Sequence, residues 1–364
     1  MPEQLNLTDP AFRGAAMGDA EATMRGTGEA GSAGAPPSSV RWDPAAFGKV
    51  FSYSSIDDFV RTPHLRDGVH RIPIPGSPPL DIFLRGVSGS VGALYRLTSR
   101  LSRKLLGRQS RLLCSFTAAQ KRADTVGPYF SGLHIQWNRY VPVVSVSDPL
   151  LIHDGNVALG WYTGLPGTHT QNIIARALAH IASVAHRPLL LTGGSGGGFA
   201  AIVFAAMLDD AARTGSRIAA QSLAFVWNPQ VSISDYSASQ PYIDAMFPRQ
   251  RGVKGAAAAK LLSQAGVIHD LRTIPVPKRL LYIQNKSDTQ HVQKHAMPYV
   301  TAQGFRRVAD GLYRRSRTQV LVVGDYGDGH IPPPRFALMS LISKLKHGRR
   351  VSRRVIESLR MHAS

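Results

Sequence analysis

The sequence predicts an α/β fold with a mostly parallel central sheet covered by helices on both faces. Segments of helical period occur at 94–105, 173–181, 199–208 and 336–345. They alternate with eight short runs rich in apolar residues, at 69–74, 80–84, 111–116, 141–147, 188–191, 222–227, 279–284 and 319–323. Near-continuous apolar strands separated by helices are typical of parallel sheets buried on both faces.

Composition divides the 364 residues into three parts. Residues 1–40 are rich in Gly, Ala, Ser, Glu and Pro without periodicity, which predicts a disordered segment, because it cannot bury enough apolar surface to offset chain entropy. Residues 41–345 are expected to form one domain, in which 229–270 is long enough to make a helical lid or cap. Residues 346–364 form a basic tail with some helical amphipathicity.

The chain has 43 basic and 23 acidic side chains, giving a formal net charge of +20. The basic residues are concentrated at 96–111 and in the tail, but no zinc finger, RNA-binding aromatic signature or helix-turn-helix spacing accompanies them, so no specific nucleic-acid partner is predicted. The tail is compatible with contact to an anionic membrane face or a protein, although a solvated tail is the simpler interpretation. The oligomeric state does not follow from the sequence.

A single cysteine excludes a disulfide framework and a four-cysteine zinc site, and it fits a reducing compartment. The first 40 residues lack a basic segment followed by an apolar one, so they do not resemble a secretory signal. No apolar run reaches the about 18 residues of a membrane-spanning helix. These observations predict a cytoplasmic protein.

The most informative segment is the glycine-rich stretch between the runs at 188–191 and 199–208, which contains Gly193-x-Ser195-x-Gly197. A strand that turns sharply into a helix holds its central residue in a strained conformation, and side chains two positions away on either side would collide. The central Ser195 hydroxyl then projects from the sheet edge, and the Gly196 N–H points toward a developing oxyanion. The pattern therefore predicts a nucleophile elbow.

A dinucleotide-binding loop is the main alternative, because Gly196-x-Gly198-x-x-Ala201 fits its relaxed fingerprint. That loop needs an acidic residue at the end of the next strand, whereas the run at 222–227 is followed by Asn-Pro-Gln. A Walker phosphate loop is excluded by the absence of the Lys-Ser/Thr pair. We predict no cofactor.

A serine nucleophile needs an imidazole to take its proton and an acid to orient that imidazole. Asp288 follows the run at 279–284, and His330 lies in a Gly-rich loop after the run at 319–323. The order Ser, Asp, His, each after a strand, matches the order of the hydrolases that use this elbow. Asp235, which follows the run at 222–227, is the alternative acid.

Over residues 70–345 the chain resembles α/β-hydrolase-fold serine hydrolases. The resemblance implies Ser195 as nucleophile, His330 as general base and then acid, and Asp288 as orienting carboxylate, with Gly196 as one oxyanion donor. The second donor would be Thr117 or Ala118, in a loop that lacks the family's His-Gly-Gly-Gly run. A fainter similarity, in Gly-Ser-Gly-Gly-Gly-Phe-Ala-Ala and Trp-Asn-Pro-Gln, is to bacterial hydrolase-fold proteins of surface-glycan or accessory-secretion systems. The implied activity is that of an esterase or O-acyltransferase on a small-molecule or glycan ester, and a catalytically silent scaffold is the alternative.

Three further features are set aside. His291 and His295 are four residues apart beside Asp288, but no further ligand is apparent, so an exposed helix face is favoured over a metal site and no metal is predicted. Trp161 and Tyr162 are more typical of core than of a substrate pocket. Cys114 falls within a buried strand and is expected to be structural.

Overall fold

The computed structural model describes residues 41–348, with gaps at 88, 90–91, 95–96, 99–100, 102–103, 105–109, 123–124, 134–141 and 211–214, together with Ile356 and Leu359. The expected disordered segment 1–40 and most of the basic tail lie outside these residues. Within the described part of the chain, no helix is long and apolar enough to cross a membrane.

One mixed sheet of eleven strands runs through the described residues, in the order β1-β2-β3-β5-β4-β6-β7-β8-β11-β10-β9. Each of the eight runs that the sequence predicts as a strand forms a strand in the structure. The strands are β1 (Val50–Ser52), β2 (Gly68–Ile74), β3 (Ser77–Arg85), β4 (Leu112–Phe116), β5 (Val143–Val146), β6 (Leu189–Gly194), β7 (Leu223–Trp227), β8 (Leu280–Asn285), β9 (Arg306–Ala309), β10 (Leu312–Ser316) and β11 (Gln319–Gly324).

The centre of the sheet is parallel and its margins are partly antiparallel. The six strands β5, β4, β6, β7, β8 and β11 pair in parallel throughout. The pairs β2–β3, β3–β5, β10–β11 and β9–β10 are antiparallel. The sheet is therefore mostly parallel, as predicted, but the hairpin of β9 and β10 and the strand β1 were not expected from the apolar pattern.

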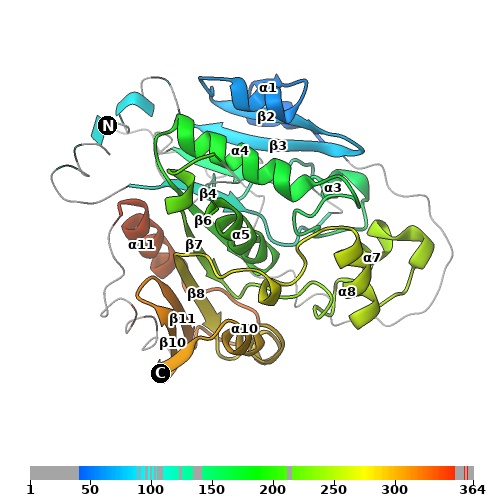
Figure 1. The fold of residues 1–364 in the computed structure, drawn as a ribbon, viewed down its shortest axis with the longest axis vertical. Coiled ribbons are helices and arrows are strands. Elements are labelled where there is room, and N and C mark those ends of the chain that lie inside the picture. The colour runs from blue at the N-terminus through cyan, green and yellow to red at the C-terminus, as the bar shows by residue number, and fades with distance from the viewer. Residues whose placement is uncertain are drawn as a thin grey trace, which may run out of the picture.

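Helices and 3₁₀ turns cover the sheet and its loops. Figure 1 shows α4 and α5 lying across the near face of the sheet. The main helices are α1 (Ile56–Arg61), α3 (Leu150–His153), α4 (Thr170–Val184), α5 (Ser195–Leu208), α7 (Gln240–Met246), α8 (Gly255–Gln264), α9 (Thr289–His291), α10 (Met297–Ala302) and α11 (Arg335–Lys346), with a π-helical turn at Val292–Ala296.

Alternating side chains of the central strands feed two separate cores. On β6, Leu189 and Leu191 join the larger core with α4 and α5, while Leu190 points to the other face. The second core contains the apolar side of α11 together with Ile356 and Leu359. This two-sided burial explains why the strands read as continuous apolar runs, since each side chain meets a covered face.

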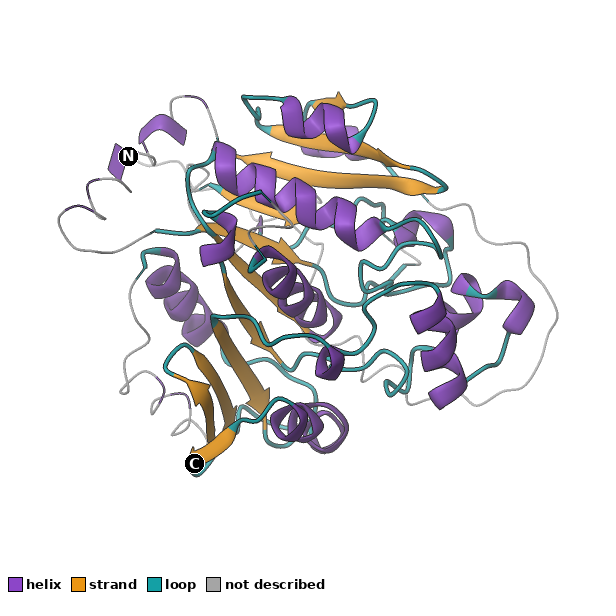
Figure 2. Cartoon of the chain, in the orientation of Figure 1, coloured by secondary structure: helices purple, strands orange, loops and turns teal. Residues whose placement is uncertain are grey.

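The segment 229–270, expected as a lid or cap, carries α7 and α8, which Figure 2 shows at one end of the molecule, away from the strands. It is joined to the domain by buried contacts. Tyr242 hydrogen-bonds Thr163 at 2.8 Å, and Gln171 exchanges two hydrogen bonds with Ile268, at 2.8 and 3.0 Å. Its role as a lid stays a prediction.

The described residues of the basic segment 94–105 are helical, and their leucines are exposed. The leucines at positions 94, 97 and 101 are 59%, 56% and 49% exposed. Leu105 and most of the surrounding arginines lie outside the described residues. Arg111 is not part of a basic surface either, because its guanidinium donates to the Leu345 carbonyl at the end of α11, and burial lowers its pKa to about 10. It therefore satisfies a helix C-terminus.

Candidate active site

Ser195 occupies the turn that the glycine pattern predicts. Strand β6 ends at Gly194, helix α5 begins at Ser195, and Ser195 has φ +51°, in the left-handed region that a non-glycine residue rarely adopts. A Cβ at Gly193 would lie 2.4 Å from the Gly197 backbone, and one at Gly197 would lie 2.5 Å from the Phe116 carbonyl oxygen. Both glycines are therefore required by close backbone approach, as the elbow prediction supposes.

The candidate catalytic residues follow strands that end at the same edge of the sheet. The register pairs Gly194 with Trp227, Trp227 with Ile283, and Gly324 with Asn285. The loops after β6, β7, β8 and β11 consequently leave the same edge of the sheet in that order. This edge, at the carboxyl ends of parallel strands, is where open α/β sheets bind ligands.

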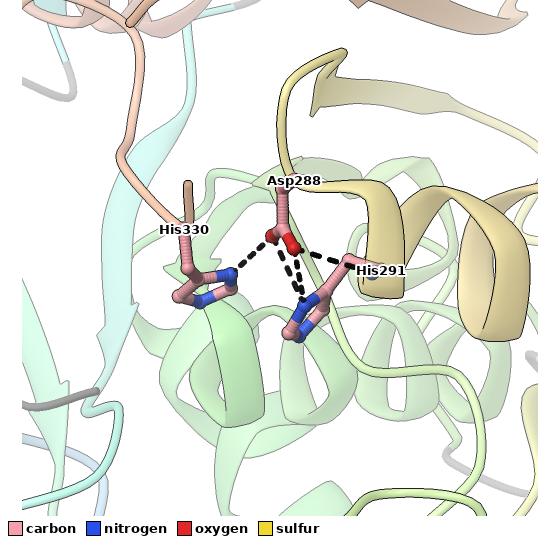
Figure 3. Close-up of side chains that lie close together, drawn as sticks. All are labelled: Asp288, His291 and His330. Atoms are coloured by element: carbon pink, nitrogen blue, oxygen red, sulfur yellow. Dashed lines mark hydrogen bonds and ion pairs between the residues drawn. The ribbon is translucent and has the colours of Figure 1, made fainter. Parts of the chain in front are cut away.

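The structure brings Asp288 and His330 into direct contact. His330 Nδ1 and Asp288 Oδ2 lie 2.5 Å apart. Figure 3 shows the His330 ring directed at this carboxylate. Asp288 is 6% exposed, and burial by itself opposes its ionisation. The hydrogen bonds from His291 and His330 outweigh that burial and hold the pKa of Asp288 well below its ordinary value. An ionised carboxylate on Nδ1 fixes the tautomer that leaves Nε2 available as a base.

A second imidazole shares the same carboxylate. His291 Nδ1 lies 3.1 Å from Asp288 Oδ1 and 3.0 Å from Oδ2, and the His291 backbone N–H donates to Oδ1 at 3.2 Å (Figure 3). His291 and His295 are 2% and 0% exposed, so the expectation of an exposed helix face is wrong. The signal in the sequence was their spacing beside Asp288. His291 ends α9 and His295 lies in the π-helical turn that follows, and both side chains are buried.

His295 is a buried, neutral ring. Its Nδ1 accepts a hydrogen bond from the Val231 N–H at 3.2 Å, and burial together with the neighbouring His291 lowers its pKa to about 3. Potential ligand atoms of Asp288, His291 and His330 all lie within 4.8 Å of one another, so this set has the composition of a metal site. The two Nδ1 atoms face the carboxylate as hydrogen-bond donors, however, and these bonds account for the arrangement.

The loop that carries His330 is held by a buried asparagine at the end of β8. Asn285 Nδ2 donates to the carbonyls of Gly327 and Gly329 at 2.8 and 2.7 Å, and its Oδ1 accepts from the Tyr326 N–H at 3.0 Å. Asn285 is 0% exposed. A glycine-rich loop has little order of its own, so these bonds fix where His330 lies.

Asn228 ties the loop after β7 to the end of β8 and to the loop after β11. Its Nδ2 donates to the Ile331 carbonyl at 2.7 Å, and its Oδ1 accepts from the Asn285 N–H at 2.7 Å. Asn228 has φ +41°, which asparagine tolerates better than most residues. The backbone next to His330 and the strand end before Asp288 are thereby linked through one side chain.

Ser195 receives a hydrogen bond from a residue that the sequence did not single out. Gln230 Nε2 donates to Ser195 Oγ at 2.9 Å. The signals in the sequence were the position of Trp-Asn-Pro-Gln directly after a strand and its part in the fainter similarity, but neither indicates that Gln230 faces Ser195. Asp235, the alternative acid, instead forms an ion pair with Arg272 at 2.8 Å.

The two candidates for the second oxyanion donor differ in their surroundings. The Thr117 N–H is engaged with the Tyr162 hydroxyl at 2.6 Å, whereas the Ala118 N–H makes no hydrogen bond within the described residues. The loop after β4 touches the elbow, since the Gly197 Cα faces the Phe116 carbonyl. The Gly196 N–H belongs to the first turn of α5, where amides have no partner within the helix.

The remaining residues discussed above are buried. Trp161 and Tyr162 are 1% and 0% exposed and belong to the core, in agreement with the simpler interpretation. Cys114 is fully buried in β4, and burial raises the pKa of its thiol far above the usual range. A reactive cysteine would need an exposed, electropositive surrounding, so Cys114 is structural.

No protein-family profile matches the sequence, and no curated protein matches it. Solved structures that overlap it include the capsule O-acetyltransferase of Neisseria meningitidis serogroup A, at 10% identity and TM-score 0.46, covering 78% of this chain and 96% of that one. The same enzyme in complex with caged gadolinium gives the same identity and TM-score, with 78% and 95% covered. A mutant of it in complex with CoA gives 10% identity and TM-score 0.45, with 77% and 95% covered. Overlap of this degree establishes neither a shared family nor a shared activity.

Proposed function

We propose that the chain is a serine-dependent hydrolase or O-acyltransferase that acts on an ester carbonyl through an acyl-enzyme. The observation that carries the proposal is the combination of a left-handed Ser195 in a strand-to-helix turn with an Asp288–His330 pair at the same sheet edge. Strained backbone at a functional serine and a buried carboxylate on a histidine Nδ1 have independent structural costs. Their presence at one edge favours nucleophilic catalysis over a silent scaffold.

In the first half of the proposed reaction, His330 Nε2 takes the Ser195 hydroxyl proton while Oγ attacks the ester carbonyl carbon. The tetrahedral oxyanion would be stabilised by the N–H groups of Gly196 and Ala118. As the intermediate collapses, the bond to the leaving alcohol breaks, and that oxygen takes the proton from His330. The products of this half are the free alcohol and an acyl ester on Ser195.

In the second half, His330 takes a proton from water or from an acceptor hydroxyl, whose oxygen attacks the acyl ester. The bond to Ser195 Oγ then breaks, and Oγ regains the proton from His330. Water gives a carboxylic acid and hence an esterase, whereas a sugar or other alcohol gives a new ester and hence a transferase. The acyl acceptor is therefore what separates the two activities.

The direct test is labelling with a fluorophosphonate probe, which reacts covalently with an activated serine. We expect the wild-type chain to be labelled and Ser195→Ala not to be. The matched control is Ser237→Ala, at an exposed serine, which should be labelled as the wild type is. Absence of labelling in the wild type would favour the scaffold alternative.

A second experiment addresses the substrate class. Hydrolysis of short acyl esters should depend on Ser195, and hydrolysis of peptides should be absent. If the chain is a transferase, adding a sugar or another alcohol as acceptor should divert acyl groups from water to that acceptor. An ester-cleaving rate that is equal in the wild type and Ser195→Ala would contradict the proposal.

A further inference from the structure

We propose, on the basis of that function, that Gln230 is a further catalytic residue that orients the Ser195 hydroxyl, and that Trp161 positions Gln230. Gln230 contacts Ser195 twice: its side-chain Nε2 donates to Oγ at 2.9 Å, and its backbone N–H donates to the Ser195 carbonyl at 3.3 Å. The glutamine is 0% exposed, so these bonds do not compete with bulk water.

Trp161 determines which end of the Gln230 amide faces the serine. Trp161 Nε1 and Gln230 Oε1 lie 2.7 Å apart. An indole N–H can only donate, so the atom that faces it must be the amide oxygen. The amide NH₂ is then turned toward Ser195, in agreement with the hydrogen bond from Nε2 to Oγ.

The position of Trp161 is itself strongly determined. Trp161 and Tyr162 are consecutive residues with φ +51° and +60°, an unfavourable conformation for aromatic side chains. The buried Asp148 carboxylate holds this turn by accepting from the backbone N–H groups of Gly160 and Tyr162, both at 3.0 Å. The Trp161 ring also packs on Tyr242, with centroids 4.9 Å apart.

The consequence for Ser195 is a defined hydrogen-bond direction. A hydroxyl has one proton and two acceptor lone pairs. When Gln230 occupies one lone pair, the proton and the second lone pair are restricted to the remaining directions, which favours one path to the base and one to the substrate carbonyl. The same N–H group would stabilise charge on Oγ when it becomes the leaving atom in the second half of the reaction.

The test measures the second-order rate constant for fluorophosphonate labelling in four single variants and one double variant. Gln230→Met keeps the side-chain volume and removes the donor, and Gln230→Glu replaces the donor with an acceptor. Trp161→Phe keeps the aromatic packing and removes the indole N–H. The matched control is Gln264→Glu, at an exposed position near the end of α8.

We expect labelling of Gln230→Met to fall by about tenfold to a hundredfold, with a larger loss for Gln230→Glu and none for the control. The labelling rate of Trp161→Phe should fall less, because Gln230 is still present but its amide is no longer oriented by the indole N–H. In the double variant Trp161→Phe/Gln230→Met, the loss should equal that of Gln230→Met alone, since Trp161 acts only through the glutamine. A merely structural role of Trp161 would add a further loss.

The outcomes separate the inference from the proposed function. If the wild type is not labelled, the proposed function fails. If the wild type is labelled and Gln230→Met reacts at the same rate, the role of Gln230 is refuted while the function stands. If Trp161→Phe lowers the rate equally with and without Gln230, the positioning role of Trp161 is refuted. Should Gln230→Glu not fold, Gln230→Met decides alone.

Discussion

The rings of His291 and His330 lie with their centroids 4.1 Å apart and their planes at 31°, and both direct Nδ1 at Asp288. A carboxylate held by two imidazoles is fixed in orientation more firmly than one held by the base alone. His291 is therefore expected to support the base without touching the substrate.

Removing the His291 hydrogen bond should weaken catalysis moderately. In His291→Phe an aromatic ring still packs against His330 and the bond to Asp288 is lost, so kcat is expected to fall by about tenfold with little change in KM. Steady-state kinetics on a chromogenic short-chain ester give both constants. The exposed His153→Phe is the control, and equal kcat values for His291→Phe and the wild type would show that the second imidazole is dispensable.

Asp288 and Asp235, the two acids that the sequence left open, should differ sharply in a direct comparison. Asp288→Asn keeps the shape but reverses the preferred tautomer of His330, and a loss of about 10³ to 10⁴ in kcat is expected. Asp235→Asn breaks only the ion pair with Arg272, whose side chains are 37% and 29% exposed, and kcat should stay within about twofold. The opposite ranking in steady-state kinetics would assign the acid to Asp235.

The pH dependence of stability should report the Asp288 carboxylate. Its pKa is lower in the folded chain than in the unfolded one, so its stabilising contribution is complete above the unfolded value of about 4 and is lost as the pH falls toward the folded value. The free energy of unfolding of Asp288→Asn should therefore lie furthest below that of the wild type near pH 6. The difference should narrow at pH 3, where the unfolded chain takes up the proton.

Denaturant unfolding at a series of pH values measures that difference. If the difference in free energy of unfolding between the wild type and Asp288→Asn grows as the pH falls from 6 to 3, the prediction is contradicted. The surface variant Asp210→Asn serves as a control for general charge effects, because that residue is exposed.

The parts of the site that sequence could predict are those fixed by strand ends. Ser195, Asp288 and His330 each follow a buried parallel strand, and parallel strands deliver the residues after them to one edge. The glycines at 193 and 197 follow from the strand-to-helix turn at Ser195, because the backbones there approach more closely than a side chain would allow. These are local or topological consequences of the pattern.

The contacts that the sequence could not predict depend on non-glycine residues that adopt a positive φ. Gln230 reaches Ser195 because the preceding Asn228 adopts φ +41°, and Trp161 reaches Gln230 because it adopts φ +51° itself. A positive φ is unfavourable for tryptophan, and although asparagine tolerates it, the residue type alone does not indicate that Asn228 adopts it. The antiparallel pair β9 and β10 was missed for a different reason: its strands are short and carry exposed arginines, which hide the alternation.

The close approach at the elbow predicts a steep difference between two glycine variants. A Cβ at Gly197 would meet the Phe116 backbone oxygen at 2.5 Å, whereas a Cβ at Gly266 meets nothing within 4 Å. Gly197→Ala should lower the free energy of unfolding by more than about 3 kcal/mol or prevent folding, since two backbones must separate. Gly266→Ala should cost about 1–2 kcal/mol, because only its φ of +72° is strained. Thermal and denaturant unfolding measure both, and equal losses would mean that the elbow can relax.

The loop that carries His330 is held by the side-chain amide of Asn285. Asn285→Asp keeps an oxygen for the Tyr326 N–H but replaces the amide donor that faces the Gly327 and Gly329 carbonyls. Those carbonyls would then face a carboxylate, and losing each hydrogen bond should cost about 0.5–1.5 kcal/mol. Because the loop would shift while the substrate surface stays, kcat should fall by a larger factor than KM rises.

Asn156→Asp, at an exposed turn, is the matched control and should leave both constants unchanged. Kinetics at temperatures well below the melting point of the variant separate misplacement of His330 from unfolding. If Asn285→Asp loses stability but retains the wild-type kcat, the loop holds His330 by other means. A fall in kcat that persists at low temperature would instead tie the position of His330 to this one amide, three residues before Asp288.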